Sequence, residues 1–164
     1  RNEKIATATE LVATVFDWAR KVGVSQPLTV GVWEYDKDGQ VVKNALNQLI
    51  VDQSDIISFH CYEPREKLTA VINALATHGR PLLCTEWLAR SAGSTVDLLS
   101  VFKDAGVGAI NWGLVDGRTQ TRFPWRSWAE RVNNEEPWFH ELLHADGTAY
   151  DVQEVETFRR LTAD

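Results

Sequence analysis

The sequence predicts an α/β fold in which parallel strands alternate with outer helices. Short runs rich in β-branched and aromatic residues begin every 26 to 28 residues along a chain of 164 residues. The longer segments between them carry apolar residues at the 3.6-residue period of amphipathic helices. Strands and helices that alternate at this step are typical of a parallel sheet with crossover helices. The predicted strands lie near 28–33, 56–62, 81–88 and 107–115.

Each predicted helix combines apolar spacing on one face with a residue that ends it. Gly23, Gly79 and Gly106 are the expected stops, and Ser94 is the expected N-cap of the fourth helix. An aromatic loop at 116–139 precedes the last part of the chain. Helices are expected at 5–22, 42–50, 64–79, 94–106 and 150–162, with a short one after Pro137. The apolar stripe of the first helix consists of Leu11, Val15, Trp18 and Val22.

Composition and charge narrow the classes of partner. The chain is 44% hydrophobic and 24% charged, and no apolar run is long enough to cross a membrane. With a net charge of -6 and no basic patch, we expect no binding to nucleic acid. We also expect no cofactor and no metal. Strand alternation places the two cysteines, Cys61 and Cys84, on opposite faces of the sheet, so we expect no disulfide between them. Both are expected as buried free thiols. The absence of methionine indicates a processed chain or part of a longer one.

Polar and aromatic residues gather where each predicted strand ends. Such a rim is typical of the active face of a (β/α)₈ barrel, whereas the glycine-rich turn of a dinucleotide-binding fold is absent after the first strand. A full barrel takes about 250 residues, so four strands predict a (β/α)₄ half of a TIM barrel, occupying 1–164 as a single domain. The rim residues are Trp33, Glu34, His60, Tyr62, Glu86, Trp87, Asn111 and Trp112.

Glu86 is the residue of this rim best suited to chemistry. Alternation puts it on the inner face with Cys84, beside inward-pointing His60 and Tyr62 on the preceding strand. Donors to a carboxylate favour its ionised form, and an ionised, oriented carboxylate can act as a nucleophile. A solvated rim carboxylate remains the alternative for Glu86, and plain core packing remains the alternative for the tryptophans.

Five blocks of the chain resemble cellulase-like glycoside hydrolases of the (β/α)₈ clan A, of the 1,4-beta-xylanase or beta-galactosidase-barrel type. They read, in order, PLTVGVW, SDIISFHCYEP, RPLLCTEWLAR, GAINWGLVDGRTQT and PWFHELLHADGTAYD. The resemblance covers nearly the whole chain and implies a retaining hydrolase of β-glycosidic bonds. It implies Glu86 as the nucleophile, oriented by Tyr62 with His60 beside it. The substrate-binding positions that it implies are Trp112, Trp33, Asn111, Gln120 and Trp125.

One element of that chemistry has no counterpart in the sequence. Retaining hydrolysis needs two carboxyl groups roughly 5 to 5.5 Å apart, one of them a general acid, and the resemblance places the acid on a strand before residue 1. Asn2 and Glu3 match the expected dipeptide, but no strand precedes them. We therefore expect weak or no hydrolysis by this chain alone. The expected partners are a carbohydrate and either a second copy, forming a homodimer, or a missing N-terminal half-barrel.

Two alternative functions stay open at this point. The first is a non-catalytic carbohydrate-binding or purely structural half-barrel. The second is a zinc peptidase, because His140, Glu141 and His144 form the motif His-Glu-x-x-His. A third zinc ligand is lacking at the position where the longer motif has one, which Tyr150 occupies. The glycosidase resemblance also accounts for this segment, so zinc is the more remote hypothesis.

Overall fold

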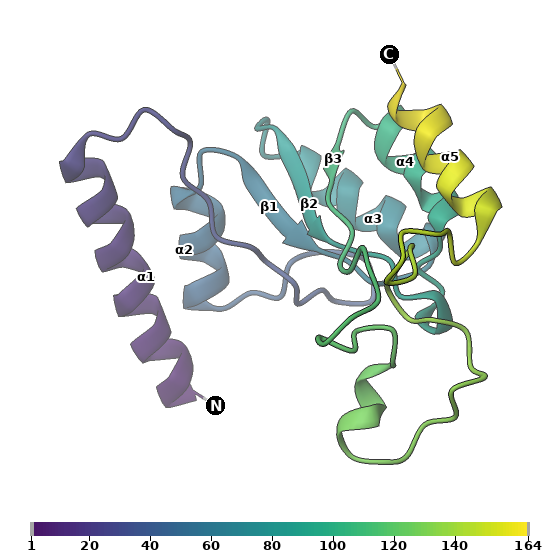
Figure 1. Cartoon of the computed structure of the whole chain (residues 1–164). Helices are drawn as coiled ribbons and strands as arrows, with labels where there is room; N and C mark the ends of the chain where they lie inside the picture. The colour runs from purple at the N-terminus through teal and green to yellow at the C-terminus, as the bar shows by residue number, and fades with distance from the viewer. Residues whose placement is uncertain (1, 164) are drawn as a thin grey trace.

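Three short strands pair in chain order to form a parallel sheet (Figure 1). They are β1 (Ile57–His60), β2 (Leu82–Glu86) and β3 (Gly108–Ala109), with β2 in the middle. A segment containing a helix connects each strand to the next, as parallel pairing requires. The predicted α/β class with parallel strands is therefore confirmed. The computed structural model describes residues 2–163.

Helices pack against the sheet and form the core with it. Phe59 of the first strand, Leu68 and Phe102 of two helices, and Trp87 just after β2 are all buried. In residues 2–163, no helix has the length and apolar character that a membrane span requires. The α-helices are α1 (Asn2–Val22), α2 (Ala45–Gln53), α3 (Arg65–Ala76), α4 (Leu99–Asp104) and α5 (Val152–Thr162). The short 3₁₀ turns are η1 (Arg90–Ala92), η2 (Val96–Leu98) and η3 (Trp125–Trp128).

The first predicted strand, 28–33, is not a strand in the structure. Only Val32 pairs with β1, through a single parallel bridge to Phe59. Next to this bridge, Thr29 Oγ1 accepts the Ser58 N–H at 3.2 Å, in the place where a backbone carbonyl would continue the ladder. A side chain thus competes with backbone pairing, and the segment follows β1 as an irregular edge.

The last predicted strand, 107–115, is reduced to the two residues of β3. The chain beyond it still follows β2, since the N–H of Ile110 bonds to the carbonyl of Cys84 at 2.8 Å. The N–H of Trp112 likewise donates to the carbonyl of Trp87 at 3.0 Å. The two acceptor carbonyls are three residues apart, whereas the two donors are only two residues apart, because the backbone of β2 is irregular.

That irregularity is a bulge at Thr85. The register pairs Phe59 with Cys84 and His60 with Glu86, which leaves Thr85 without a partner on β1. Residues paired across parallel strands point to the same face, so Cys84 faces the core with Phe59 while Glu86 turns to the other face with His60. The prediction that Cys84 and Glu86 share a face is wrong. The prediction that separated the two cysteines fails with it, although both are buried free thiols as expected.

The first helix forms as predicted, but a different face of it is buried. Phe16 is 5% exposed and packs inward, and α1 contacts α2. The apolar stripe that indicated the helix, from Leu11 to Val22, is exposed. Periodicity therefore identified the helix without identifying its buried side.

Two further helix predictions are corrected. Ser94 is not an N-cap: its hydroxyl accepts the N–H of Leu88 at 3.2 Å, and the turn η2 begins only after Thr95. The short helix expected after Pro137 does not form. Leu143 in this segment instead makes isolated bridges on both sides, one parallel and one antiparallel, and extended pairing replaces helical turns there.

Candidate active site

The carboxylate of Glu86 contacts Tyr62 and His60 at the end of β2. Tyr62 Oη donates to Glu86 Oε2 at 2.9 Å, and His60 Nδ1 lies 3.2 Å from the same oxygen. Within residues 2–163, Oε1 has no hydrogen-bond partner. One oxygen is therefore anchored, and the other makes no hydrogen bond within the described residues. The structure brings together the three residues that the sequence predicted as one group.

Tyr62 is suited to a donor role. Burial raises the pKa of its phenol well above the usual value, and the neighbouring Glu86 carboxylate raises it further. The hydroxyl therefore keeps its proton at physiological pH and donates a hydrogen bond to Glu86 Oε2. Tyr35, which sequence reasoning did not select, fixes the backbone of this site: its hydroxyl bonds to the carbonyls of Val32 and His60, each at 3.0 Å.

The imidazole of His60 sits between a glycine and a tryptophan. A Cβ on Gly31 would lie 2.9 Å from His60 Nε2, closer than packing allows. On the other side the ring of Trp33 stacks on His60, with centroids 6.0 Å apart and planes at 23°. Gly31 is a functional position that sequence reasoning missed. A glycine inside an apolar run was the available signal, because it often marks a close approach to the backbone.

Aromatic rings wall the space in front of Glu86. Trp125, from the turn η3, meets Tyr62 edge to face at 5.0 Å and Phe139 at 4.8 Å. These contacts bring the loop at 116–139 back over the strand ends. The resulting cavity of about 540 Å³ is lined by Trp33, Tyr35, His60, Cys61, Tyr62, Glu63, Glu86, Ala92 and Trp125.

The remaining predicted substrate residues do not line this cavity. Asn111 Nδ2 donates to the carbonyl of Gly113 at 2.5 Å, and its role in the structure is to shape that turn. Trp112 is partly exposed beyond β3, and Gln120 lies on the loop with a φ of 56°. Glu3 is exposed on the first turn of α1 and is likewise absent from the cavity wall.

The residues of the His-Glu-x-x-His motif serve packing in the structure. His140 is buried, its Nδ1 donates to the carbonyl of Leu88 at 2.5 Å, and burial lowers its pKa. Glu141 is buried and bonded to Thr121, while His144 packs its ring on Trp138. The motif is not on a helix, so its two imidazoles lack the spacing of a zinc-binding turn. No group of three potential metal ligands occurs in the described part of the chain. The geometry gives the zinc hypothesis no support.

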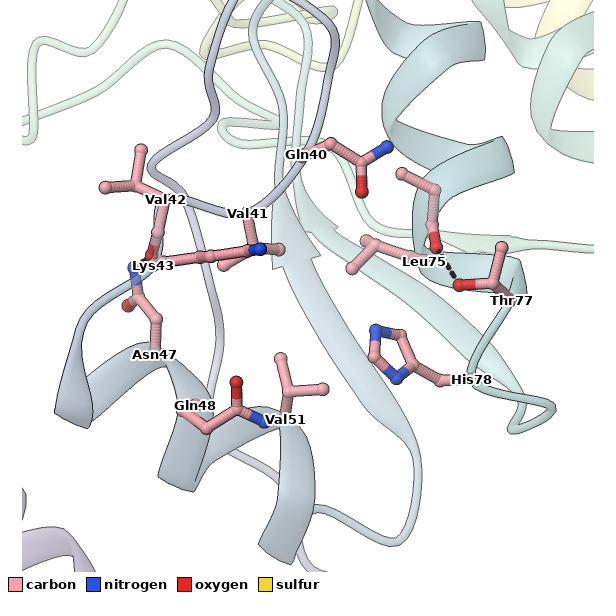
Figure 2. A pocket seen from close by; sticks show the side chains of 11 residues that line it. Gln40, Val41, Val42, Lys43, Asn47, Gln48, Val51, Leu75, Thr77 and His78 are labelled. Atoms are coloured by element: carbon pink, nitrogen blue, oxygen red, sulfur yellow. Dashed lines mark hydrogen bonds between the residues drawn. The ribbon is translucent and has the colours of Figure 1, made fainter.

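A second cavity, of about 220 Å³, lies between α2, the end of α3 and the segment 40–43 (Figure 2). The two bonds there tie the wall together internally. Asn47 Nδ2 donates to the carbonyl of Val42 at 2.8 Å, and Thr77 Oγ1 donates to that of Ala74 at 2.6 Å. Glu86 is not part of this wall, and we assign the cavity no function.

Comparison with known proteins adds no assignment. No protein-family model matches the chain, and no curated protein matches it. Functional inference therefore depends on the geometry around Glu86.

Proposed function

We propose that Glu86 is the nucleophile of a retaining β-glycosidase site, carried by a chain that forms half of a (β/α)₈ barrel. The observation that carries the proposal is the asymmetric anchoring of its carboxylate. Tyr62 and His60 both hold Oε2, so Oε1 is free to attack an anomeric carbon. The Tyr62 hydrogen bond and the His60 contact keep the carboxylate oriented.

The walls of the cavity support a sugar as the ligand. Exposed indole faces pack well against the apolar faces of pyranose rings, and Trp33 and Trp125 flank the carboxylate as partly exposed rings. We propose that these two tryptophans bind the sugar that reacts. Asn111, Trp112 and Gln120 belong in the proposal only as outer contacts, because they lie away from the cavity wall.

The order of the parallel segments supports the half-barrel part of the proposal. The bridge at Val32, then β1, β2 and β3, run parallel and side by side in chain order, with helices between them. Parallel sheets are normally covered on both faces. We propose that another half-barrel, from a second copy or from an N-terminal half, completes the ring.

Among residues 2–163, the cavity wall holds no protected second carboxylate that would suit a catalytic acid. Glu63 is the second carboxylate on the cavity wall, but it is exposed at the start of the loop to α3. A general acid is normally held in an environment that keeps it protonated. We therefore propose weak or absent hydrolysis of ordinary glycosides, together with a competent first chemical step.

That first step can be tested without an acid. In a 2,4-dinitrophenyl 2-deoxy-2-fluoro-β-glycoside the leaving group departs as a phenolate and needs no proton. Glu86 Oε1 would form an ester bond to the anomeric carbon while the bond to the phenolate breaks. The protein is incubated with the gluco, xylo, manno and galacto reagents. Intact mass and peptide mapping are expected to show one added sugar on the peptide that contains Glu86.

Matched variants separate the possible outcomes. Glu86→Gln is expected to abolish labelling, and Glu63→Gln, which alters the other wall carboxylate, is expected to leave it unchanged. Labelling of Glu63, or no labelling by any reagent, contradicts the proposal. In the latter case, calorimetry with xylo- and cello-oligosaccharides distinguishes a sugar-binding module from a structural one.

A further inference from the structure

The outer face of α1 carries an apolar stripe that nothing in residues 2–163 covers. Leu11, Val15, Trp18 and Val22 are 60%, 48%, 60% and 80% exposed. Figure 1 shows α1 as the outermost element, with α2 beside it on one side only. Single exposed apolar residues are ordinary, but a contiguous row on one helix face indicates a contact surface.

We propose that this stripe is a self-association surface through which two copies of the chain pair their α1 helices in antiparallel orientation. The proposal is independent of the glycosidase function. The stripe has steps of four, three and four residues, the spacing of a coiled-coil seam. This order reads the same in both directions. A twofold axis between Val15 and Trp18 therefore places Leu11 against Val22 of the partner subunit, and Val15 against the partner subunit's Trp18.

Lys21 flanks the stripe and is already paired within the chain. Lys21 Nζ lies 2.6 Å from Asp17, one helical turn away. Arg20 is on the opposite face of α1, where it lies 3.0 Å from Asp55 and donates to the carbonyl of Gln53 at 2.7 Å. Pairing of two copies would therefore not leave an uncompensated charge in the contact, which is the costly case. A second copy is a suitable occupant because the seam is apolar and its own complement.

The size of the stripe sets the expected strength. From side-chain sizes and these exposed fractions, the stripe offers roughly 400–500 Å² per copy. A standard stable interface uses about 800 Å² per partner. We therefore expect a weak dimer, with dissociation in the range of tens to hundreds of micromolar.

Sedimentation velocity of the chain from 5 to 500 µM tests the proposal. We expect a concentration-dependent monomer–dimer equilibrium that Trp18→Glu weakens by at least tenfold. The matched control is Trp128→Glu, which changes an even more exposed tryptophan on η3 and is expected to leave dimerisation unchanged. Circular dichroism checks that both variants fold. A monomer at every concentration overturns the proposal, as does an equal effect of the two substitutions.

The orientation has its own test. Thr7 and Thr14 occupy equivalent places on α1, each with its hydroxyl bonded to the carbonyl four residues earlier. The native thiols are buried, so a nitroxide label can be directed to an introduced cysteine. With the axis between Val15 and Trp18, labels at Thr14→Cys are offset along the helix by about 8 Å and labels at Thr7→Cys by about 28 Å. Electron-electron dipolar spectroscopy at high protein concentration should give a clearly longer distance for Thr7→Cys. Equal distances would indicate parallel pairing and overturn the antiparallel arrangement.

Discussion

Replacement of Gly31 by alanine should show directly how His60 is seated beside Glu86. An added Cβ would come within 2.9 Å of His60 Nε2, and the three nearest atoms that it would meet all belong to this imidazole. The φ of Gly31 is not in the left-handed region, so alanine adds no backbone strain there. The loss of stability expected for Gly31→Ala therefore comes from the contact with the His60 imidazole. A second substitution, at His60, can remove that contact.

The two backgrounds are expected to give opposite signs. With His60 present, Gly31→Ala overpacks the site and should destabilise the protein by about 1–3 kcal/mol. In a His60→Ala background the collision is gone. The same change then restricts only the unfolded chain and should stabilise the fold by about 0.4–1 kcal/mol.

Urea denaturation of the four proteins in this double-mutant cycle measures the effect. We expect a coupling energy of about 1.5–4 kcal/mol between Gly31 and His60. Additive effects, which for independent sites agree within about 0.5 kcal/mol, would refute the reasoning. Labelling of Glu86 by a fluoroglycoside should also slow in Gly31→Ala, because the displaced imidazole loses its 3.2 Å contact with the carboxylate.

Three further predictions concern cysteine, glutamate and arginine side chains that are largely buried. Burial raises the pKa of the Cys61 thiol to about 11 and raises the pKa of the Cys84 thiol further. A disulfide reagent at pH 8 should therefore modify neither thiol until urea unfolds the protein. Rapid modification of the native protein would contradict this prediction. Burial also raises the pKa of Glu141 above its ordinary value of 4.5. A raised carboxyl pKa favours the fold below the unfolded pKa and this contribution is lost as pH rises, so Glu141→Gln should gain stability relative to wild type between pH 4 and 8. A difference in urea midpoint that stays constant over this pH range would exclude the effect. The Arg90 side chain is 9% exposed, pairs with Glu154 and donates to the carbonyls of Trp138 and Glu141. Arg90→Met should cost about 3–5 kcal/mol in urea unfolding. A cost near zero would show that the pair is not structural.

Much of the site follows from local pattern. The ends of two predicted neighbouring strands carry His60, Tyr62 and Glu86, and the structure joins these side chains by direct contacts. Parallel strands bring their carboxyl ends to one edge, so proximity could be predicted from position along the chain. Their roles in catalysis stay predictions.

The residues that were missed act through contacts between distant segments. Tyr35 belongs to the site because its hydroxyl bonds to the carbonyl of His60, and Gly31 because it lies against the imidazole of the same residue. Neither contact leaves a periodic trace in the sequence. The same holds for the segment at 137–149, where pairing with a remote residue replaced the expected helix.

The sequence by itself determined the alternation of strands and helices, the parallel order and the ends of the strands at which chemistry is possible. These properties come from the spacing of apolar residues and from glycine and proline, which act locally. Only the tertiary structure decided which face of each element is buried. The bulge at Thr85 reversed the faces of Cys84 and Glu86, and α1 packed through Phe16 and left the stripe around Trp18 exposed. Periodicity specifies that one face differs from another, whereas the partner that covers a face is chosen by packing across the whole fold.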